Sequence, residues 1–191
     1  CVNRPGNYEL PLGTTFRELI FEHGGGVPAG RKIKAIMAAG ASSALIAADD
    51  VALDTPMDYE SVPNVGGTLG SASVIVIDDT VSIPWLINKT VHFFKHESCG
   101  KCTPCREGTG YAKRILNAII NGEGHDGDLE LLLSIADQYN GTTICPLAPA
   151  LGAPMTALIK KYRSEFEAYI EKNPNHGSPR ICATYRPGAF W

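Results

Sequence analysis

Three cysteines at regular two-residue intervals are the part of the sequence whose spacing is most informative about chemistry. Cys99, Cys102 and Cys105 form a Cys-x-x-Cys-x-x-Cys pattern. One loop with this spacing can curl around a corner of an iron–sulfur cubane and give three irons a thiolate each, so that the fourth iron needs a distant ligand. Cys145, which stands forty residues after Cys105 and is followed by Pro146, is the natural fourth ligand. The sequence therefore predicts a [4Fe–4S] cluster held by these four cysteines.

Two alternatives to this ligand set stay open. Structural zinc sites usually pair two Cys-x-x-Cys or Cys/His knuckles, whereas here three cysteines share one loop and the fourth is remote. This spacing favours the iron–sulfur cluster, and a zinc-stabilised interaction module without a redox role is the competing hypothesis. Cys182 could replace Cys145 as the remote ligand, although its Pro- and Gly-containing segment would first have to become ordered. Cys1 has no second cysteine at ligand spacing and is interpreted as an ordinary thiol.

The charge around the cysteines differs in sign from that of the whole chain. Six basic and two acidic side chains lie between Lys89 and Arg114, a local charge of +4, whereas the whole chain has a formal charge of −3. A positive field and backbone N–H donors near Gly100 would stabilise an additional electron on a cluster. This pattern indicates an electron carrier, although the same residues could simply solvate helix faces.

Length and composition limit the remaining possibilities. The chain has 191 residues, of which 44% are hydrophobic and 19% charged, as in globular proteins of one large or two small domains. Without a basic excess we expect no nucleic-acid partner. The longest apolar run, Ala35–Ala48, is too short to cross a bilayer, so no direct membrane insertion is expected. Because the chain opens on Cys1 without a leader pattern, we interpret it as part of a longer polypeptide. Six cysteines are too few for a disulfide scaffold at this length and three of them lie within seven residues, so we expect a reducing compartment.

Residues 1–80 have the pattern of a small α+β domain. Short strands are expected at Asn7–Leu10, Lys32–Met37 and Ser73–Ile77. Between the first two, Thr14–Phe21 is expected to be a helix, because a Thr followed three residues later by Glu18 resembles a capping box. One helix across a small sheet makes a ubiquitin-like β-grasp domain the leading hypothesis for this half.

Helical periodicity begins near residue 81 and continues to residue 172. Four helices are expected, at Ser82–Glu97, Arg106–Asn121, Asp128–Tyr139 and Pro154–Lys172, and their apolar stripes are expected to be core. The fold class is therefore α+β, with a β-grasp domain (1–80) followed by a small all-α helical bundle (81–172) that carries the cluster. Residues 173–191 are expected to be an irregular tail, in which Tyr185, Phe190 and Trp191 are candidates for docking on a partner.

Glycine-rich segments do not indicate a nucleotide site. Gly122–Gly127 matches Gly-x-Gly-x-x-Gly, but it follows a helix rather than a strand and contains two acidic residues that would repel a pyrophosphate. We interpret it as a turn between helices.

Four segments of the chain resemble one known family. The segment Lys95–Gly108 is similar to the cysteine motif of the NADH-binding flavoprotein subunits of respiratory complex I, and the resemblance extends to Arg4–Ile20, Leu53–Met57 and Ile144–Pro149. The resemblance implies that Cys99, Cys102, Cys105 and Cys145 are the cluster ligands. It also implies that this chain corresponds to the β-grasp (SLBB) and [4Fe–4S] domains of an NADH dehydrogenase subunit.

The same resemblance implies the wider context. FMN and NADH would bind only to the preceding part of the parent chain, so this chain alone would be inactive towards NADH and would transfer electrons taken from FMN. Its partners would be the [2Fe–2S] subunit and the large iron–sulfur subunit of the NADH-oxidising module. The expected location is cytoplasmic, peripheral on the inner face of the energy-transducing membrane, or on the matrix side in a mitochondrion. Diaphorase subunits of NAD-reducing hydrogenases and NAD-dependent formate dehydrogenases share the cysteine motif and remain alternatives, as does a β-grasp protein that binds a small ligand.

Overall fold

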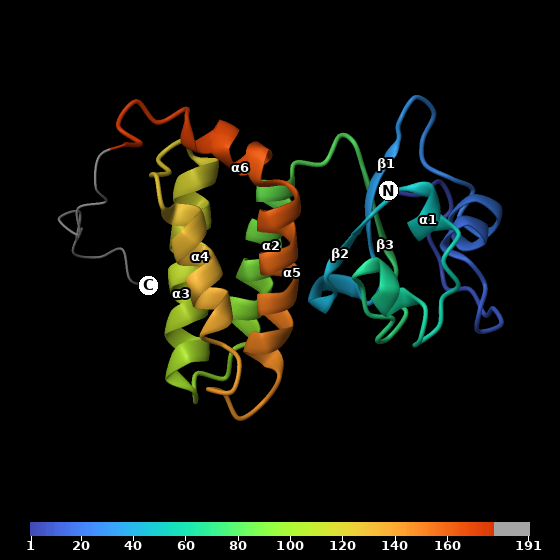
Figure 1. Ribbon diagram of the computed structural model, residues 1–191, viewed down its shortest axis with the longest axis horizontal. Helices are drawn as coiled ribbons and strands as arrows, with labels where there is room; N and C mark the ends of the chain where they lie inside the picture. Colours follow the sequence, from blue (N-terminus) through green and yellow to red (C-terminus); the bar gives the residue numbers. More distant parts are fainter. Residues whose placement is uncertain (178–191) are drawn as a thin grey trace.

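A three-stranded antiparallel sheet forms the centre of the first half of the chain (Figure 1). The structure is a computed structural model and describes residues 1–177. The central strand β1 (Ile33–Met37) pairs with β2 (Leu45–Ala47) on one side and with β3 (Ile75–Asp78) on the other. In the register, Ile36 lies opposite both Ile46 and Val76.

The sequence predicted two of these strands and placed the third wrongly. Strands were expected close to β1 and β3, and both are confirmed with shifts of one or two residues. Asn7–Leu10 is not a strand. It stands between Pro5 and Pro11, which have no N–H to donate to a neighbouring strand. The actual third strand, β2, has only three residues and no polar alternation that would mark it.

The two faces of the sheet are buried in different clusters. Side chains alternate between the faces along a strand because the period of the strand is two residues. One face packs against Phe16 and Ile20 in the first half of the chain, and the other belongs to the same buried cluster as the helices. The first face contributes Ile36, Ala38, Ile46 and Val76, and the second contributes Ala35, Met37, Leu45 and Ile77.

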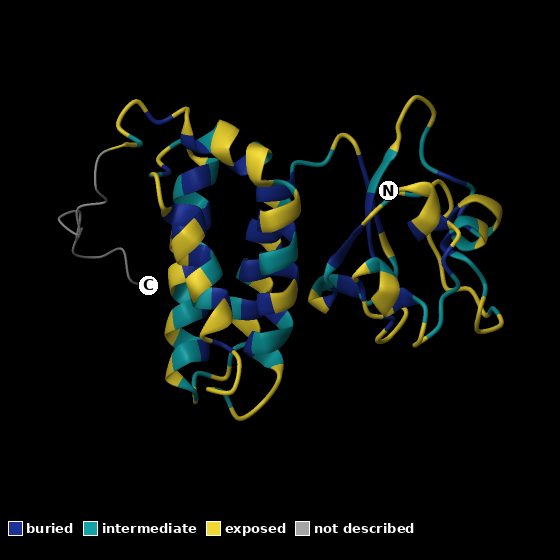
Figure 2. Cartoon of the chain, viewed as in Figure 1, coloured by how far each residue is buried: buried dark blue, intermediate teal, exposed yellow. Residues whose placement is uncertain are grey.

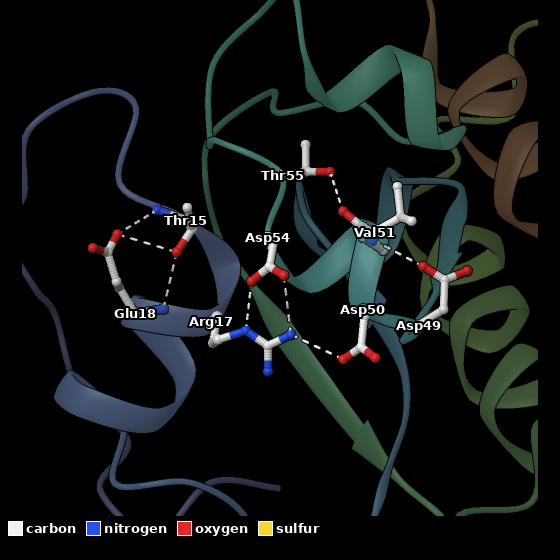
Figure 3. Close-up of polar contacts among 9 residues, drawn as sticks. Thr15, Arg17, Glu18, Asp49, Asp50, Val51, Asp54 and Thr55 are labelled. Carbon is white, nitrogen blue, oxygen red and sulfur yellow. Dashed lines mark hydrogen bonds and ion pairs between the residues drawn. The ribbon is translucent and has the colours of Figure 1, made fainter.

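A polar network fixes the helix that covers the first face (Figure 3). This helix includes the π-helical turn η1 (Glu18–His23). The backbone N–H of Thr15 donates to Glu18 Oε2 at 2.9 Å, and the Glu18 N–H donates to Thr15 Oγ1 at 3.1 Å, which confirms the expected capping box. Arg17 then reaches across to α1 (Asp50–Leu53), with Nη2 3.0 Å from Asp50 Oδ1, and to Asp54 beyond it, with Nε 2.5 Å from Oδ1.

Four helices of the second half lie side by side, and a shorter fifth crosses one end of the bundle (Figure 1). The buried residues lie mainly on the sides of these helices that face one another (Figure 2). In chain order they are α2 (Ile83–Glu97), α3 (Thr103–Ile120), α4 (Asp128–Asp137), α5 (Leu147–Lys161) and α6 (Arg163–Ile170). The expected class, a small β-grasp-like α+β unit followed by a helical bundle, is confirmed. In the described residues, no helix combines the length and apolar character required to cross a membrane.

The last predicted helix was wrong at its beginning and in its continuity. A single helix was expected over Pro154–Lys172 because its apolar residues recur with helical spacing. Instead, α5 begins at Leu147 and Pro154 lies inside it, and the apolar face continues through the proline with Leu151, Met155 and Leu158 all buried. The chain then bends at Tyr162, with φ −122° and ψ 34°, before α6. The predicted tail begins within the described part and continues beyond it, so Cys182, Tyr185, Phe190 and Trp191 lie outside the described residues.

Several contacts join the sheet to the helices. Lys34, at an irregularity of the β1–β3 register, forms an ion pair with Glu165 of α6 and donates to the Val81 carbonyl at 3.1 Å. The Tyr162 hydroxyl donates to the carbonyl of Lys34 at 3.1 Å, and Lys161 Nζ donates to the carbonyl of Leu45 at 2.6 Å. The division after residue 80 stays a prediction.

Candidate iron–sulfur site

The two cysteine-bearing loops lie at the same end of the helical bundle (Figure 1). One loop joins α2 to α3, and the other joins α4 to α5. They are in contact, because the backbone N–H of Ile144 donates to Cys102 Sγ at 3.5 Å. This contact places the residue next to Cys145 against the second cysteine of the motif, although forty-two positions separate the two partners in the sequence. The fold thereby brings the remote cysteine to the loop that carries the other three.

Backbone and side-chain hydrogen bonds fix the shape of the first loop. Gly100 has φ +78°, a conformation in which a larger residue would be strained. Its carbonyl accepts a bond from Arg106 Nη1 at 2.7 Å, which ties the loop to the first turn of α3. Lys95 Nζ in turn donates to the Arg106 carbonyl at 3.1 Å and links the end of α2 to the same turn. The loop is therefore positioned by the helices on both sides.

The four cysteines differ in their exposure. Cys105 is buried, with 7% of its surface exposed, and its sulfur is 3.2 Å from the hydroxyl oxygen of Ser98. Cys102 is half-buried, whereas Cys99 and Cys145 are exposed. A group bound by all four cysteines would therefore lie at the end of the bundle, with the side bound by Cys105 towards the interior and the side bound by Cys99 and Cys145 towards the solvent.

Two of the cysteines lie at the N-termini of helices. Cys102 is the N-cap residue of α3, and Cys145 directly precedes Pro146, the N-cap residue of α5. The N-terminus of a helix carries a partial positive charge that stabilises thiolates and other anions nearby. This feature was missed from the sequence, because α5 was expected to begin at Pro154. The signal that could have revealed it is Pro149, a residue that the first turn of a helix tolerates.

The basic side chains around the motif are less concentrated at the cysteines than the sequence indicated. Lys89 lies over the ring of Trp85, and Arg114 lies 4.5 Å from the ring centroid of Tyr111, so both contact aromatic rings on their own helices. Arg106 remains at the motif and pairs with Glu107 at 2.8 Å, which lowers the pKa of the Glu107 carboxyl. Lys95 also stays beside the motif, with its Nζ donating to the Arg106 carbonyl at 3.1 Å, and the N-termini of α3 and α5 add partial positive charge.

The structure brings the loops together without gathering the sulfurs. Among residues 1–177, no three His, Cys, Asp or Glu side chains form a group that could hold a metal ion. The donor chemistry nevertheless fits an iron–sulfur cluster, because four thiols are available on two touching loops. A second observation agrees: the buried hydroxyl of Tyr139 has no hydrogen-bond partner in the part of the chain that the structure describes, and it lies against the first turns of α3, the helix that contains Cys105. The assignment of the four ligands stays a prediction.

Comparison with known families matches both halves of the chain. Residues 85–169 match the family model described as the NADH-ubiquinone oxidoreductase-F iron–sulfur binding region. Residues 2–44 match the SLBB domain model. The first match includes the cysteine motif and Cys145, and the second covers β1 and the helix that packs on the sheet.

Curated relatives extend the match along the chain. The chain is 44% identical over 171 residues to the second F subunit of NADH-quinone oxidoreductase in Rhizobium meliloti, a match that covers 90% of this chain and 40% of the relative. It is 41% identical over 170 residues to the F subunit of the Mycobacterium tuberculosis enzyme, covering 89% of this chain and 38% of the relative. The F subunit of the Escherichia coli enzyme is 39% identical over 172 residues, with coverage of 90% and 38%. The chain thus spans about two fifths of the length of these relatives.

Solved structures agree with the sequence comparison. An NAD+-reducing [NiFe]-hydrogenase in the air-oxidised state superposes with a TM-score of 0.77 at 28% identity, covering 88% of this chain and 28% of the hydrogenase chain. The structure of an NAD+-reducing [NiFe]-hydrogenase in the H2-reduced state superposes with a TM-score of 0.76. The resemblance seen in the cysteine motif is thereby confirmed. The chain is thus similar over about nine tenths of its length to F subunits of NADH-quinone oxidoreductases, and it matches the SLBB domain model at residues 2–44 and the iron–sulfur binding model at residues 85–169.

Proposed function

We propose that this chain transfers electrons through one [4Fe–4S] cluster held by Cys99, Cys102, Cys105 and Cys145. The observation that carries the proposal is the contact of the Ile144 N–H with Cys102 Sγ at 3.5 Å, which joins the fourth cysteine to the motif. Such a cluster, when bound, accepts and releases one electron at a time.

The residues around the cysteines have separate tasks in this proposal. Gly100 and Arg106 hold the loop in a curled conformation, so that three cysteines on one short segment can face different irons. The N-termini of α3 and α5 offset the negative charge of four thiolates. Cys105 ties one side of the site to the interior, where the Ser98 hydroxyl can donate to its sulfur at 3.2 Å. Hydrogen bonds to ligand sulfurs favour the more negative, reduced state.

The wider role follows from the family and is part of the same proposal. Electrons would reach the cluster from FMN, reduced by NADH on the remainder of the parent protein, and would leave towards the [2Fe–2S] subunit or the large iron–sulfur subunit of the NADH-oxidising module. The module would be peripheral on the inner, cytoplasmic face of the energy-transducing membrane, or on the matrix side in a mitochondrion. The structural match to an NAD+-reducing hydrogenase favours a second candidate, in which the same electron transfer occurs in the diaphorase part of a hydrogenase.

The test is to purify the chain without oxygen, count iron and sulfide, and record absorption and EPR spectra after reduction with dithionite. About four irons per chain, a broad absorption near 400 nm and an EPR signal of the reduced state are expected. A colourless protein with one zinc per chain would overturn the proposal in favour of a zinc-stabilised module.

Cysteine-to-alanine variants test the ligand set. Cys145→Ala should lose the four-iron cluster, whereas Cys1→Ala and Cys182→Ala should retain it and serve as matched controls. Four irons retained in Cys145→Ala would contradict its assignment. Loss of the cluster in Cys182→Ala with retention in Cys145→Ala would make Cys182 the remote ligand.

A further inference from the structure

The ring of Tyr139 lies in a space that two glycines leave open. Tyr139 follows the C-terminus of α4 and is completely buried. A Cβ on Gly108 of α3 would come within 2.7 Å of Tyr139 Cε1, and a Cβ on Gly152 of α5 would lie 3.5 Å from Tyr139 Cδ2. Three helices of the bundle are thus fitted around this one aromatic ring.

The hydroxyl of Tyr139 is anomalous in this environment. Within residues 1–177, it and Asn88 Oδ1 are the buried side-chain polar atoms that have no hydrogen-bond partner. A buried hydroxyl without a partner loses its hydration and gains nothing in return, so a phenylalanine would fill the same space at lower cost. The presence of a tyrosine therefore points to an acceptor that is not a protein atom of the described residues.

The position of the hydroxyl indicates where that acceptor would be. Tyr139 Oη is 3.3 Å from the place of a Cβ on Gly108, and Gly108 follows Cys105 by three residues, one turn along the same face of α3. The burial of the ring raises the pKa of the Tyr139 phenol, and the nearby Cys105 raises it in the same direction. The group thus remains a protonated donor beside the buried cysteine of the motif.

We infer that the Tyr139 hydroxyl donates a hydrogen bond to a sulfur atom of the bound cluster or of its ligand Cys105, and so favours the reduced state. This inference rests on the proposed function and makes Tyr139 a positioning and tuning residue rather than a ligand. A donor directed at sulfur stabilises the more negative oxidation state and raises the reduction potential. The acceptor would also satisfy the one polar group of the ring.

The test is Tyr139→Phe in the full chain, reconstituted anaerobically with iron and sulfide and titrated with dithionite while the EPR signal of the reduced cluster is followed. The variant should bind the same four irons, and its equilibrium constant for reduction should fall about tenfold, which corresponds to about 59 mV for one electron. Tyr162→Phe is the matched control, because it removes a phenolic hydroxyl that donates to the Lys34 carbonyl at the other end of α5. Its potential should not change.

Unfolding of the metal-free chain separates tuning from a structural role. Without the cluster, Tyr139→Phe should be at least as stable as the original chain, since it removes an unpaired polar group. An unchanged potential in a variant that binds four irons would overturn the inference and leave the proposed function intact, with a buried water as the acceptor. A wild-type chain that takes up no iron–sulfur cluster would instead refute the proposed function. A metal-free variant that unfolds more easily than wild type would assign the hydroxyl a structural role and contradict the inference.

Discussion

Replacing Gly108 by alanine should destabilise the bundle, although alanine is the better helix former. Gly108 lies inside α3, where Gly→Ala normally stabilises a helix by about 1 kcal/mol. The new Cβ, however, would lie 2.7 Å from Tyr139 Cε1, on a ring that is fully buried and cannot move aside freely. Overpacking of this kind costs about 1–3 kcal/mol, so the net destabilisation should be about 0–2 kcal/mol.

Gly110 provides a matched control on the same helix. A Cβ at Gly110 would lie 3.7 Å from Cε of the flexible Lys95 side chain, which is ordinary van der Waals contact. Gly110→Ala should therefore stabilise the chain by about 1 kcal/mol, and the two variants should differ by about 1–3 kcal/mol. The measurement is urea unfolding of the metal-free chain followed by far-UV circular dichroism.

A third variant locates the cause in the tyrosine ring. In a Tyr139→Leu background the ring edge is gone, so adding Gly108→Ala should become neutral or stabilising. If Gly108→Ala in the original chain were as stabilising as Gly110→Ala, the close packing of the ring against α3 would be refuted. The environment assigned to the Tyr139 hydroxyl would then be refuted with it.

Two further predictions concern the sheet and its junction with the helices. Asp78 accepts hydrogen bonds from Thr80 and Arg31, which lower the pKa of its carboxyl below the ordinary 3.8; its contribution to stability is therefore present above about pH 4 and is lost as the pH falls through the lowered pKa. Asp78→Asn should lower the melting temperature at pH 6, by an amount that shrinks below pH 4, and a constant difference from pH 6 to pH 2 would contradict this assignment. Lys34→Ala and Glu165→Ala should each destabilise the chain by about 1–3 kcal/mol, because each leaves a partly buried charge unpaired. In urea unfolding, the double variant should lose about 0.5–3 kcal/mol less free energy of unfolding than the sum of the losses in the two single variants. Strictly additive losses would mean that this ion pair does not couple the sheet to α6.

Local signals allowed the sequence to predict most of the fold. The capping box at Thr15 and Glu18 and the apolar stripe of α3 depend on neighbouring residues, and both were confirmed. The β2 strand and the start of α5 depend on tertiary packing. The three apolar residues of β2 form a strand because they pair with β1. Pro154 is tolerated inside α5 because buried residues before and after it pack in the core and keep the helix continuous.

The candidate site was predictable in its residue types but not in its surroundings. The spacing of the cysteines indicated the four ligands, and the structure adds that their loops touch. The helix N-terminus after Cys145 and the unpaired hydroxyl of Tyr139 require the positions of three helices, which no local pattern specifies. An apolar stripe that ends in tyrosine indicates a core residue, and only the bundle shows that its oxygen has no protein partner among the residues that the structure describes.

The sheet has a consequence for how the two halves of this chain could be exchanged between proteins. Two separate family models match the two halves, yet one face of the sheet lies in the same buried cluster as α2 to α5. A chimera that takes its first half from another protein would expose or misfit Ala35, Met37, Leu45 and Ile77 unless α5 changed with them. Recombination at the boundary should therefore succeed only between chains whose sheet face and bundle are complementary.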